Sequence, residues 1–310
     1  MISTQVGPGV ALAWVLSLFI FGCAAQRGSV RPAPPFAGVN GPLIIAHRGG
    51  SLEAPENTLE SIRHGVDVGA DWQECDVGLS RDEEIVVIHD DTLERTTNGT
   101  GRVEDKTLVE LKTLFAGRPK PAEATAARLA ERGIVAPDFG ERYAGARIPT
   151  LAEVLDIPGS RLMIELKRSS RGERLVRQVV DVIGKRGAES RVVLASFDEQ
   201  LLWATFNADP SLPLLGLVDD EDSLQRMLQL PVRVLGVRAD FAARALEVAP
   251  PSVAVWTWTV LDLPMADELV ALGVHGLVTD VPEALVKVIR KVSDVVIKPD
   301  EPVPNDDAKK

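Results

Sequence analysis

Four short polar clusters stand at the ends of apolar, strand-like runs, and their residue types could do chemistry. They are His47-Arg48, Glu74-Cys75-Asp76, His89-Asp90 and Glu165-Leu166-Lys167. Charged side chains and imidazoles are costly where strands converge on a core, unless they pair, bind a metal ion or react. We therefore expect the clusters to form one site that combines proton transfer with the binding of a cation.

Two of the clusters place charged side chains two residues apart. In a strand, residues i and i+2 lie on one face about 6.6 Å apart, so Glu74 projects beside Asp76 and Glu165 beside Lys167. Three carboxylates with room for water suit Ca²⁺ or Mg²⁺, and zinc would call for a cluster of His and Cys. Lys167 adds a positive charge for phosphate oxygens. Cys75 points to the opposite face and is interpreted as a small buried residue.

His47 and His89 are two of the four histidines in the chain, and both end β-like apolar runs. In a barrel of parallel strands, that position is the catalytic rim. Because imidazole titrates near pH ~6.5, one neutral and one protonated histidine make a base and acid pair at neutral pH. His64, within a helical pattern, and His275, in a helix–strand turn, are interpreted as structural residues.

The acidic composition narrows the range of partners. The chain has 310 residues, a formal net charge of −11, 45% hydrophobic residues and 25% charged residues. This is ordinary globular composition for one large domain or two smaller ones. The charge argues against nucleic acid as a partner, because nucleic-acid binding needs a basic face. An acidic protein that acts on an anionic small molecule needs local positive charge, which a divalent cation supplies.

Strand-like and helix-like stretches alternate from residue 43 onward. Strands are predicted at 43–46, 72–79, 85–89, 162–166, 191–196, 213–217, 234–238, 252–258 and 276–279. The alternation predicts an α/β fold, a TIM-like (β/α)₈ barrel with a helical insertion at 116–147, and a doubly wound sheet is the alternative. The predicted strands number nine, one more than the eight of such a barrel. Because no helix fits between 72–79 and 85–89, an irregular or hairpin-like connection is expected there. Asn57 and Glu60 are expected to cap the following helix.

The first segment has the pattern of an export signal. Its apolar run, 9–22, is shorter than the about 20 residues that span a membrane. Gly22 and Cys23 resemble the end of a bacterial lipoprotein signal, with Cys23 lipidated; an ordinary cleaved signal, an uncleaved anchor or a misassigned start are the alternatives. We expect an exported protein, anchored to a membrane by lipid and facing the periplasm or cell exterior, or otherwise periplasmic or secreted.

The domain organisation follows from these patterns. Residues 1–23 are predicted to be the signal, and 24–42 a proline-rich tether. A single domain is expected over 43–293. The polar end, 294–310, is predicted to be a disordered tail.

Several longer motifs carry a family resemblance. In order along the chain occur HRGGSLEAPENTLES, GADWQECDVGLSRDEEIVVIHDDTLERTTNGTGRV, ARIPTLAEVL, LMIELK, VVLASFD, WTWTV and LGVHGLVTDVP. Together they closely resemble the glycerophosphodiester phosphodiesterase family, whose members are PLC-like phosphodiesterases with a TIM barrel. The resemblance runs from about residue 43 to residue 290.

The resemblance implies a phosphoric diester hydrolase that uses one divalent cation, Ca²⁺ or Mg²⁺. Its reaction would convert glycerophosphodiesters to sn-glycerol 3-phosphate and an alcohol. The motif positions imply that His47 and His89 are the catalytic pair and that Glu74, Asp76 and Glu165 are the metal ligands. They also imply that Arg48 and Lys167 bind the phosphate, that Trp258 lines the glycerol or head-group pocket, and that Glu56 supports the site.

Other functions remain open at this stage. Leu261 stands where the family usually has an asparagine, which puts one polar contact in doubt. A lysophospholipase-D-like activity on lysolipids is the alternative function, because a membrane tether would bring the site close to lipids. A non-catalytic surface binding protein is a third reading, weakened because the full set of reactive residues is present.

Overall fold

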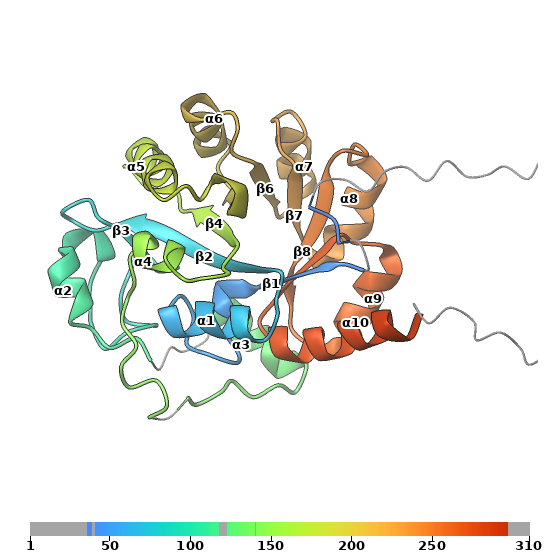
Figure 1. The fold of residues 1–310 in the computed structure, drawn as a ribbon, viewed down its shortest axis with the longest axis horizontal. Helices are drawn as coiled ribbons and strands as arrows, with labels where there is room; N and C mark the ends of the chain where they lie inside the picture. Colours follow the sequence, from blue (N-terminus) through green and yellow to red (C-terminus); the bar gives the residue numbers. More distant parts are fainter. Residues whose placement is uncertain (1–35, 39–40, 118–122, 140, 297–310) are drawn as a thin grey trace, which may run out of the picture. The chain divides into compact units, whose positions relative to one another are not determined.

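Nine strands and the helices between them form a (β/α)₈ barrel with one additional strand (Figure 1). The structure is a computed structural model that describes residues 36–38, 41–117, 123–139 and 141–296. The predicted signal, 1–23, lies outside them. The strands are β1 Leu43–Ala46, β2 Trp72–Leu79, β3 Ile85–Val87, β4 Leu162–Leu166, β5 Val192–Ser196, β6 Leu214–Val218, β7 Val234–Arg238, β8 Ala254–Val260 and β9 Gly276–Thr279.

The helices follow the strands as the sequence pattern predicted. They are α1 Leu59–Asp67, α2 Leu108–Lys112, α3 Glu123–Glu131, α4 Leu151–Leu155, α5 Gly172–Lys185, α6 Glu199–Ala208, α7 Glu221–Met227, α8 Ala242–Val248, α9 Leu263–Leu272 and α10 Pro282–Val296. Short 3₁₀ turns are η1 His47–Gly49, η2 Val103–Asp105, η3 Glu189–Arg191 and η4 Ala239–Phe241. Within the described residues, no helix is both long and apolar enough to cross a membrane.

Eight parallel strands close the barrel, and the ninth lies outside it. The closed order is β1, β2, β4, β5, β6, β7, β8 and β9, with β1 paired to both β2 and β9. β3 pairs antiparallel with β2, with Val87 opposite Val77. The barrel prediction is therefore confirmed, and the surplus strand is explained by the hairpin-like connection expected after β2.

Alternate residues of the strands build two core layers. One layer fills the barrel interior and includes Ile45, Met163 and Trp256. The other lies between the strands and the helices and includes Ile44 and Cys75. In Figure 1, helices α5 to α8 line the outside of the central strands. Cys75 is fully buried, so its interpretation as a small core residue is confirmed.

Phe36 packs at the end of the barrel where the strands begin. Its ring lies 5.8 Å from that of Trp72, the first residue of β2, and 6.4 Å from that of Trp256. Its carbonyl accepts a hydrogen bond of 2.9 Å from Trp256 Nε1. Phe36, which lies inside the predicted tether 24–42, therefore contacts the barrel, and the local Pro-rich composition does not reveal this long-range aromatic contact.

Two further boundaries differ from the predictions. The N-cap of α1 is Thr58, whose hydroxyl accepts a hydrogen bond from the backbone N–H of Ser61, so Asn57 and Glu60 do not form the cap. Helix α10 continues to Val296, three residues into the predicted tail at 294–310. Its apolar periodicity continues past the predicted boundary and outweighs the polar composition that follows.

The segment 116–147 contains helix α3. Arg128 of this helix donates a hydrogen bond of 2.7 Å to the carbonyl of Thr259, near the end of β8. Arg132 pairs with Asp262, directly after β8. Because these partners lie where β8 ends, α3 borders the end of the barrel that carries the polar clusters.

Candidate active site

The carboxyl ends of β2 and β4 bring three carboxylates together. Asp76 of β2 lies directly opposite Glu165 of β4, and Glu74 stands two residues earlier on the same face as Asp76. Ligand oxygens of the three groups all lie within 4.8 Å of one another. This is the arrangement expected from the two-residue spacing, and three converging oxygens can hold one hard cation.

The electrostatics of this group also fit a cation. Glu74 Oε1 is buried and has no hydrogen-bond partner in the described part of the chain. Burial, followed by the negative charges of Asp76 and Glu165, raises the pKa of the Glu74 carboxyl well above its ordinary value. An orphaned oxygen in a crowded group of carboxylates is a position that a divalent ion would satisfy.

Asp76 is held ionised by its surroundings. Burial alone would raise its pKa, but the charges of Lys167, His89 and Arg48 and a hydrogen bond from Asn57 hold that pKa well below the ordinary value. Lys167 Nζ lies 3.0 Å from Asp76 Oδ1 and 2.7 Å from a Glu165 oxygen. The cation expected to meet phosphate thus stands beside the carboxylates.

Asn57 belongs to the site rather than to the helix cap. It adopts a left-handed backbone conformation with φ of 57°. Its Nδ2 donates to Asp76 Oδ2 at 2.8 Å, and its Oδ1 accepts from the Asp76 backbone N–H at 3.1 Å. This two-point contact fixes the orientation of one candidate metal ligand, as partners outside the ligand set commonly do.

His47 and Arg48 are placed by a tight turn after β1. Arg48, Gly49 and Gly50 all have positive φ angles, 52°, 84° and 106°. A Cβ at Gly49 would lie 2.4 Å from the backbone of Ser61, so glycine is required there. The turn also lets the Arg48 backbone N–H donate to Glu74 Oε2 at 2.7 Å, which joins it to the carboxylate group.

Asp280 holds His47, although the two residues are far apart in sequence. The pairing of β1 with β9 sets Ala46 opposite Thr279, so His47 and Asp280, which follow these two residues, lie next to each other. Asp280 Oδ1 lies 2.5 Å from His47 Nδ1, and His47 Nε2 lies 3.9 Å from Glu74 Oε2. A carboxylate can only accept, so Nδ1 carries the proton and Nε2 faces the site.

His89 is held in the same way by its neighbour. Its Nδ1 lies 2.6 Å from Asp90 Oδ1, which leaves Nε2 available for reaction. The antiparallel course of β3 returns the chain toward the carboxylates, because the Ile88 backbone N–H donates to the Asp76 carbonyl at 3.0 Å. The structure therefore brings both predicted histidines to the same end of the barrel.

Arg95 connects the two halves of the site. Its guanidinium donates to both oxygens of Asp90 at 2.6 and 2.8 Å and to both oxygens of Glu56 at 2.6 and 2.9 Å. Glu56 in turn accepts from Arg48 Nη1 at 2.8 Å. Although burial raises the pKa of Glu56, the charge of Arg48 and the hydrogen bonds of Arg95 lower it to about 2. The predicted support by Glu56 is thus a bridge between two arginines.

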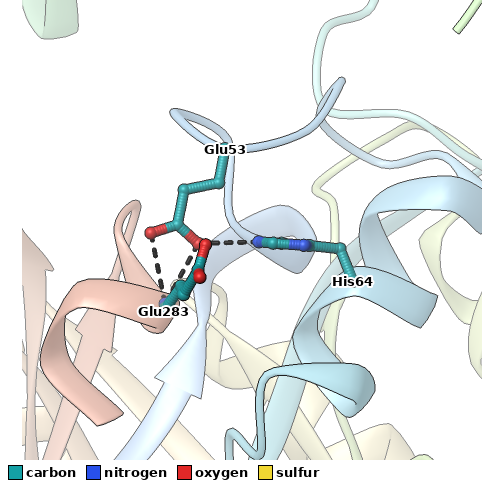
Figure 2. A group of neighbouring side chains, drawn as sticks. All are labelled: Glu53, His64 and Glu283. Carbon is teal, nitrogen blue, oxygen red and sulfur yellow. Dashed lines mark hydrogen bonds and ion pairs between the residues drawn. The ribbon is translucent and has the colours of Figure 1, made fainter. Parts of the chain in front are cut away.

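A separate group of Glu53, His64 and Glu283 stabilises the loop that carries Asp280. Figure 2 shows Glu53 between the His64 ring and the start of α10. Glu53 accepts from the Glu283 backbone N–H at 3.0 Å and lies 2.7 Å from His64 Nε2. A carboxylate at a helix N-terminus satisfies free N–H groups and the helix dipole. This group therefore acts as a helix cap, and the structural interpretation of His64 is confirmed.

The remaining predicted residues have simpler surroundings. Trp258 is half-buried, donates from Nε1 to the Gly236 carbonyl at 2.9 Å, and packs edge-on against Phe197 with ring centroids 5.5 Å apart. Leu261 is buried. His275 Nδ1 accepts from the Val255 backbone N–H at 3.0 Å, which fits its structural interpretation.

Sequence reasoning assigned no role to Arg95 and Asp280, and it assigned Asn57 to a helix cap instead of the site. Each stands inside a motif that carried the family resemblance, in PENTLES, TLERTTNG and LVTDVP. Only their position inside these motifs could have indicated a role in the site, because their spacing from neighbouring residues does not indicate which partners they contact.

Two histidines held by carboxylates, beside a group of acids that could bind a cation, can support acid–base chemistry on an anionic substrate. The model of the glycerophosphoryl diester phosphodiesterase family matches residues 47–284. The chain belongs to this family, and it is a phosphoric diester hydrolase of the glycerophosphodiester phosphodiesterase class.

Relatives and solved structures agree with this assignment. The chain is 32% identical over 268 residues to a glycerophosphodiester phosphodiesterase of Caldanaerobacter subterraneus, covering 80% of this chain and 98% of that one. It is similar, with TM-score 0.69 and 27% identity, to an Oleispira antarctica phosphodiesterase in complex with the product sn-glycerol-3-phosphate, over 81% and 97% of the two chains. A Silicibacter pomeroyi structure matches the fold with TM-score 0.71 and 22% identity, over 83% and 96%.

Proposed function

We propose that this enzyme hydrolyses glycerophosphodiesters to sn-glycerol 3-phosphate and an alcohol, with His47 and His89 as the acid–base pair and one divalent cation. The proposal rests on the hydrogen bond that each histidine makes through Nδ1 with a carboxylate: His47 bonds to Asp280, and His89 bonds to Asp90. Both Nε2 atoms are thereby free for proton transfer at one barrel end. The product seen in the Oleispira relative supports the same reaction here.

The two histidines divide the proton transfers. One takes the proton from the attacking oxygen, which is water or the glycerol 2-hydroxyl of the substrate. The other gives a proton to the oxygen of the departing alcohol as the P–O bond breaks. Attack by the 2-hydroxyl would gain from proximity and give a cyclic phosphate, and water would then attack its phosphorus and break the bond to the 2-oxygen to give sn-glycerol 3-phosphate. Direct hydrolysis would introduce the water oxygen in the same step that releases the alcohol. Trapping the cyclic product, or ¹⁸O incorporation in a single step, distinguishes the two routes.

Arg48 and Lys167 are the residues proposed to bind the phosphate. Arg48 Nε is buried without a hydrogen-bond partner among the described residues, although it lies 3.5 Å from Asp76 Oδ2. The Arg48 guanidinium forms an ion pair with Glu56, and the Lys167 ammonium group forms an ion pair with Glu165. A Ca²⁺ or Mg²⁺ ion held by Glu74, Asp76 and Glu165 would neutralise negative charge on the phosphoryl oxygens.

Soluble glycerophosphodiesters are the proposed substrates, and lysolipids are the alternative. Phe36, where the described chain begins, packs at the end of the barrel opposite the site. An acyl chain on the substrate would meet the glycerol side, where Phe197 is 41% exposed beside Trp258.

The test uses the purified full-length protein with glycerophosphocholine and with lysophosphatidylcholine, with and without EDTA. We expect turnover of glycerophosphocholine that EDTA abolishes and that Ca²⁺ or Mg²⁺ restores. His47→Ala should lose this turnover while it keeps the wild-type melting temperature within a few degrees. Faster turnover of the lysolipid would favour the alternative, and turnover that EDTA leaves unchanged would contradict a metal-dependent reaction.

We also propose that the protein is exported and anchored through lipid on Cys23, facing the periplasm or cell exterior. The apolar run at 9–22, which ends at Gly22 and is followed by Cys23, supports this, and these residues lie outside the described part of the chain. Mass spectrometry of the mature N-terminal peptide should show a diacylglyceryl cysteine, and Cys23→Ser should move the protein from the membrane to the soluble fraction. An unmodified N-terminus upstream of Cys23 would contradict the proposal.

A further inference from the structure

A pocket of about 220 Å³ with many charged lining residues opens beside His89. Its walls come from the end of β2, the residues after β3, the η2 turn and the loop between β4 and α5. His89 and Lys167 stand where it meets the catalytic group. Pockets for drug-sized ligands measure about 300–1,000 Å³, so this one suits a smaller molecule.

The pocket offers hydrogen-bond donors and acceptors in close alternation. Arg102 and Arg171 supply guanidinium groups, and Asp91 and Glu104 supply carboxylates. Arg102 Nε donates to Glu104 Oε1 at 2.8 Å, while Arg171 is anchored by the Leu79 carbonyl. The carboxylates thus fix the position of the Arg102 guanidinium, and the Arg102 side chain remains 49% exposed.

Two serine hydroxyls complete this lining. Ser169 and Ser170 stand on the loop between Lys167 and Arg171, and a hydroxyl can donate and accept at once. The lining also contains Arg168, whose side chain is 78% exposed. Among the residues that the structure describes, the pocket lining contains no Phe, Tyr or Trp. Quaternary ammonium groups make no N–H hydrogen bonds and are commonly bound by aromatic cages, so this lining does not favour choline.

We propose that this pocket binds the leaving alcohol of the substrate and selects neutral or anionic polyhydroxyl alcohols, such as glycerol, over choline. The inference rests on the proposed function, since the pocket receives the alcohol that the phosphodiester reaction releases. Arg102 and Ser170 are its specificity-determining residues, and His89 is the histidine beside the departing oxygen.

The test compares kcat/KM for glycerophosphoglycerol and glycerophosphocholine in the metal-loaded full-length enzyme. We expect a preference of about tenfold for the glycerol ester. Arg102→Ala and Ser170→Ala should each lower that ratio about three- to tenfold, mainly through the KM of glycerophosphoglycerol. Arg244→Ala is the matched control, because Arg244 is a similarly exposed arginine on α8 whose partners are Glu221 and Glu247.

The possible outcomes separate the subsite from the reaction. Preference for the choline ester, or an equal fall for both substrates in the two variants, overturns the proposed subsite while the proposed reaction stands. Absence of turnover for every glycerophosphodiester, in protein that melts cooperatively and binds metal, overturns the proposed function and the subsite with it. A Ser170→Ala melting temperature equal to wild type shows that its ratio change does not come from unfolding.

Discussion

Arg95→Gln gives a quantitative test of the network that joins the two histidine-bearing halves of the site. Arg95 is 14% exposed and meets Glu56, which is 6% exposed, and Asp90, which is 25% exposed. The Glu56 pKa falls from 4.5 to about 2 in the folded chain. A difference of this size corresponds to about 3 kcal/mol of folding free energy at neutral pH.

The Arg95→Gln variant should lose a large part of this stabilisation. Arg48 also lowers the Glu56 pKa, so we assign about half of the effect to Arg95 and add a smaller contribution from Asp90. The expected loss is about 2 kcal/mol in the free energy of unfolding, below the about 3–5 kcal/mol for leaving a buried charge without its partner, because Arg48 still pairs with Glu56. We also expect kcat to fall about tenfold or more, because Asp90, which holds His89, and Glu56, which holds Arg48, each lose a positioning contact.

The pH dependence of this loss has a defined sign. Because the folded-state pKa of Glu56 lies below its unfolded value, its stabilisation is complete above pH 4.5 and is lost as the pH falls toward 2. The difference in the free energy of unfolding between wild type and Arg95→Gln should therefore reach its maximum at pH 5 and pH 7 and be smaller near pH ~3.5. Urea unfolding followed by circular dichroism at these three pH values measures it.

Arg244→Gln provides the matched control for Arg95→Gln. Arg244 also bridges two carboxylates, Glu221 and Glu247, but all three side chains are more than 40% exposed. Exposed ion pairs contribute little, so no measurable change is expected. The reasoning would be refuted by equal effects of the two substitutions, or by an Arg95→Gln protein with wild-type stability and wild-type kcat.

Three other predictions concern the catalytic group itself. Asp280→Asn should lower kcat about 10²- to 10⁴-fold with little change in KM or melting temperature, because the amide no longer fixes the His47 tautomer; steady-state kinetics check this, and retention of kcat would contradict it. Asn57→Ala should weaken divalent metal binding about 10- to 100-fold in calorimetry, because Asp76 loses its two-point contact. Metal binding should tighten as the pH rises, because a proton competes with the ion for the Glu74 carboxyl, whose pKa is raised; calorimetric titration at several pH values measures the affinity, and an affinity that does not change with pH would contradict it.

Local sequence patterns were sufficient to predict the elements and the carboxylate group. Strand runs of Val, Ile and Leu between helical patterns gave the barrel, and most strand boundaries lie within two residues of the predicted ones. The period of two places Glu74 and Asp76 on one face and Cys75 on the other, whatever the surrounding fold. The parallel register then brings Glu165 beside Asp76.

Contacts between distant segments were beyond these patterns. Asn57 has the residue type and position of a helix cap, and local chemistry alone does not distinguish that role from its bonds to Asp76. Phe36 lies in a proline-rich stretch whose composition indicates a tether. The position of each side chain depends on a partner that the chain reaches through the fold, and a local pattern carries no information on that partner.

The amino-acid sequence by itself determined the family, the barrel and the types of reactive group at its catalytic end. The tertiary structure decided how those groups are held and which neighbours they have. Barrel closure pairs β1 with β9 and sets Asp280 against His47 across 233 residues of sequence. Folding of the loop after β3 likewise lets one guanidinium, Arg95, bind Glu56 and Asp90 together. Side-chain period is a local property, whereas register between strands is fixed when the whole sheet closes.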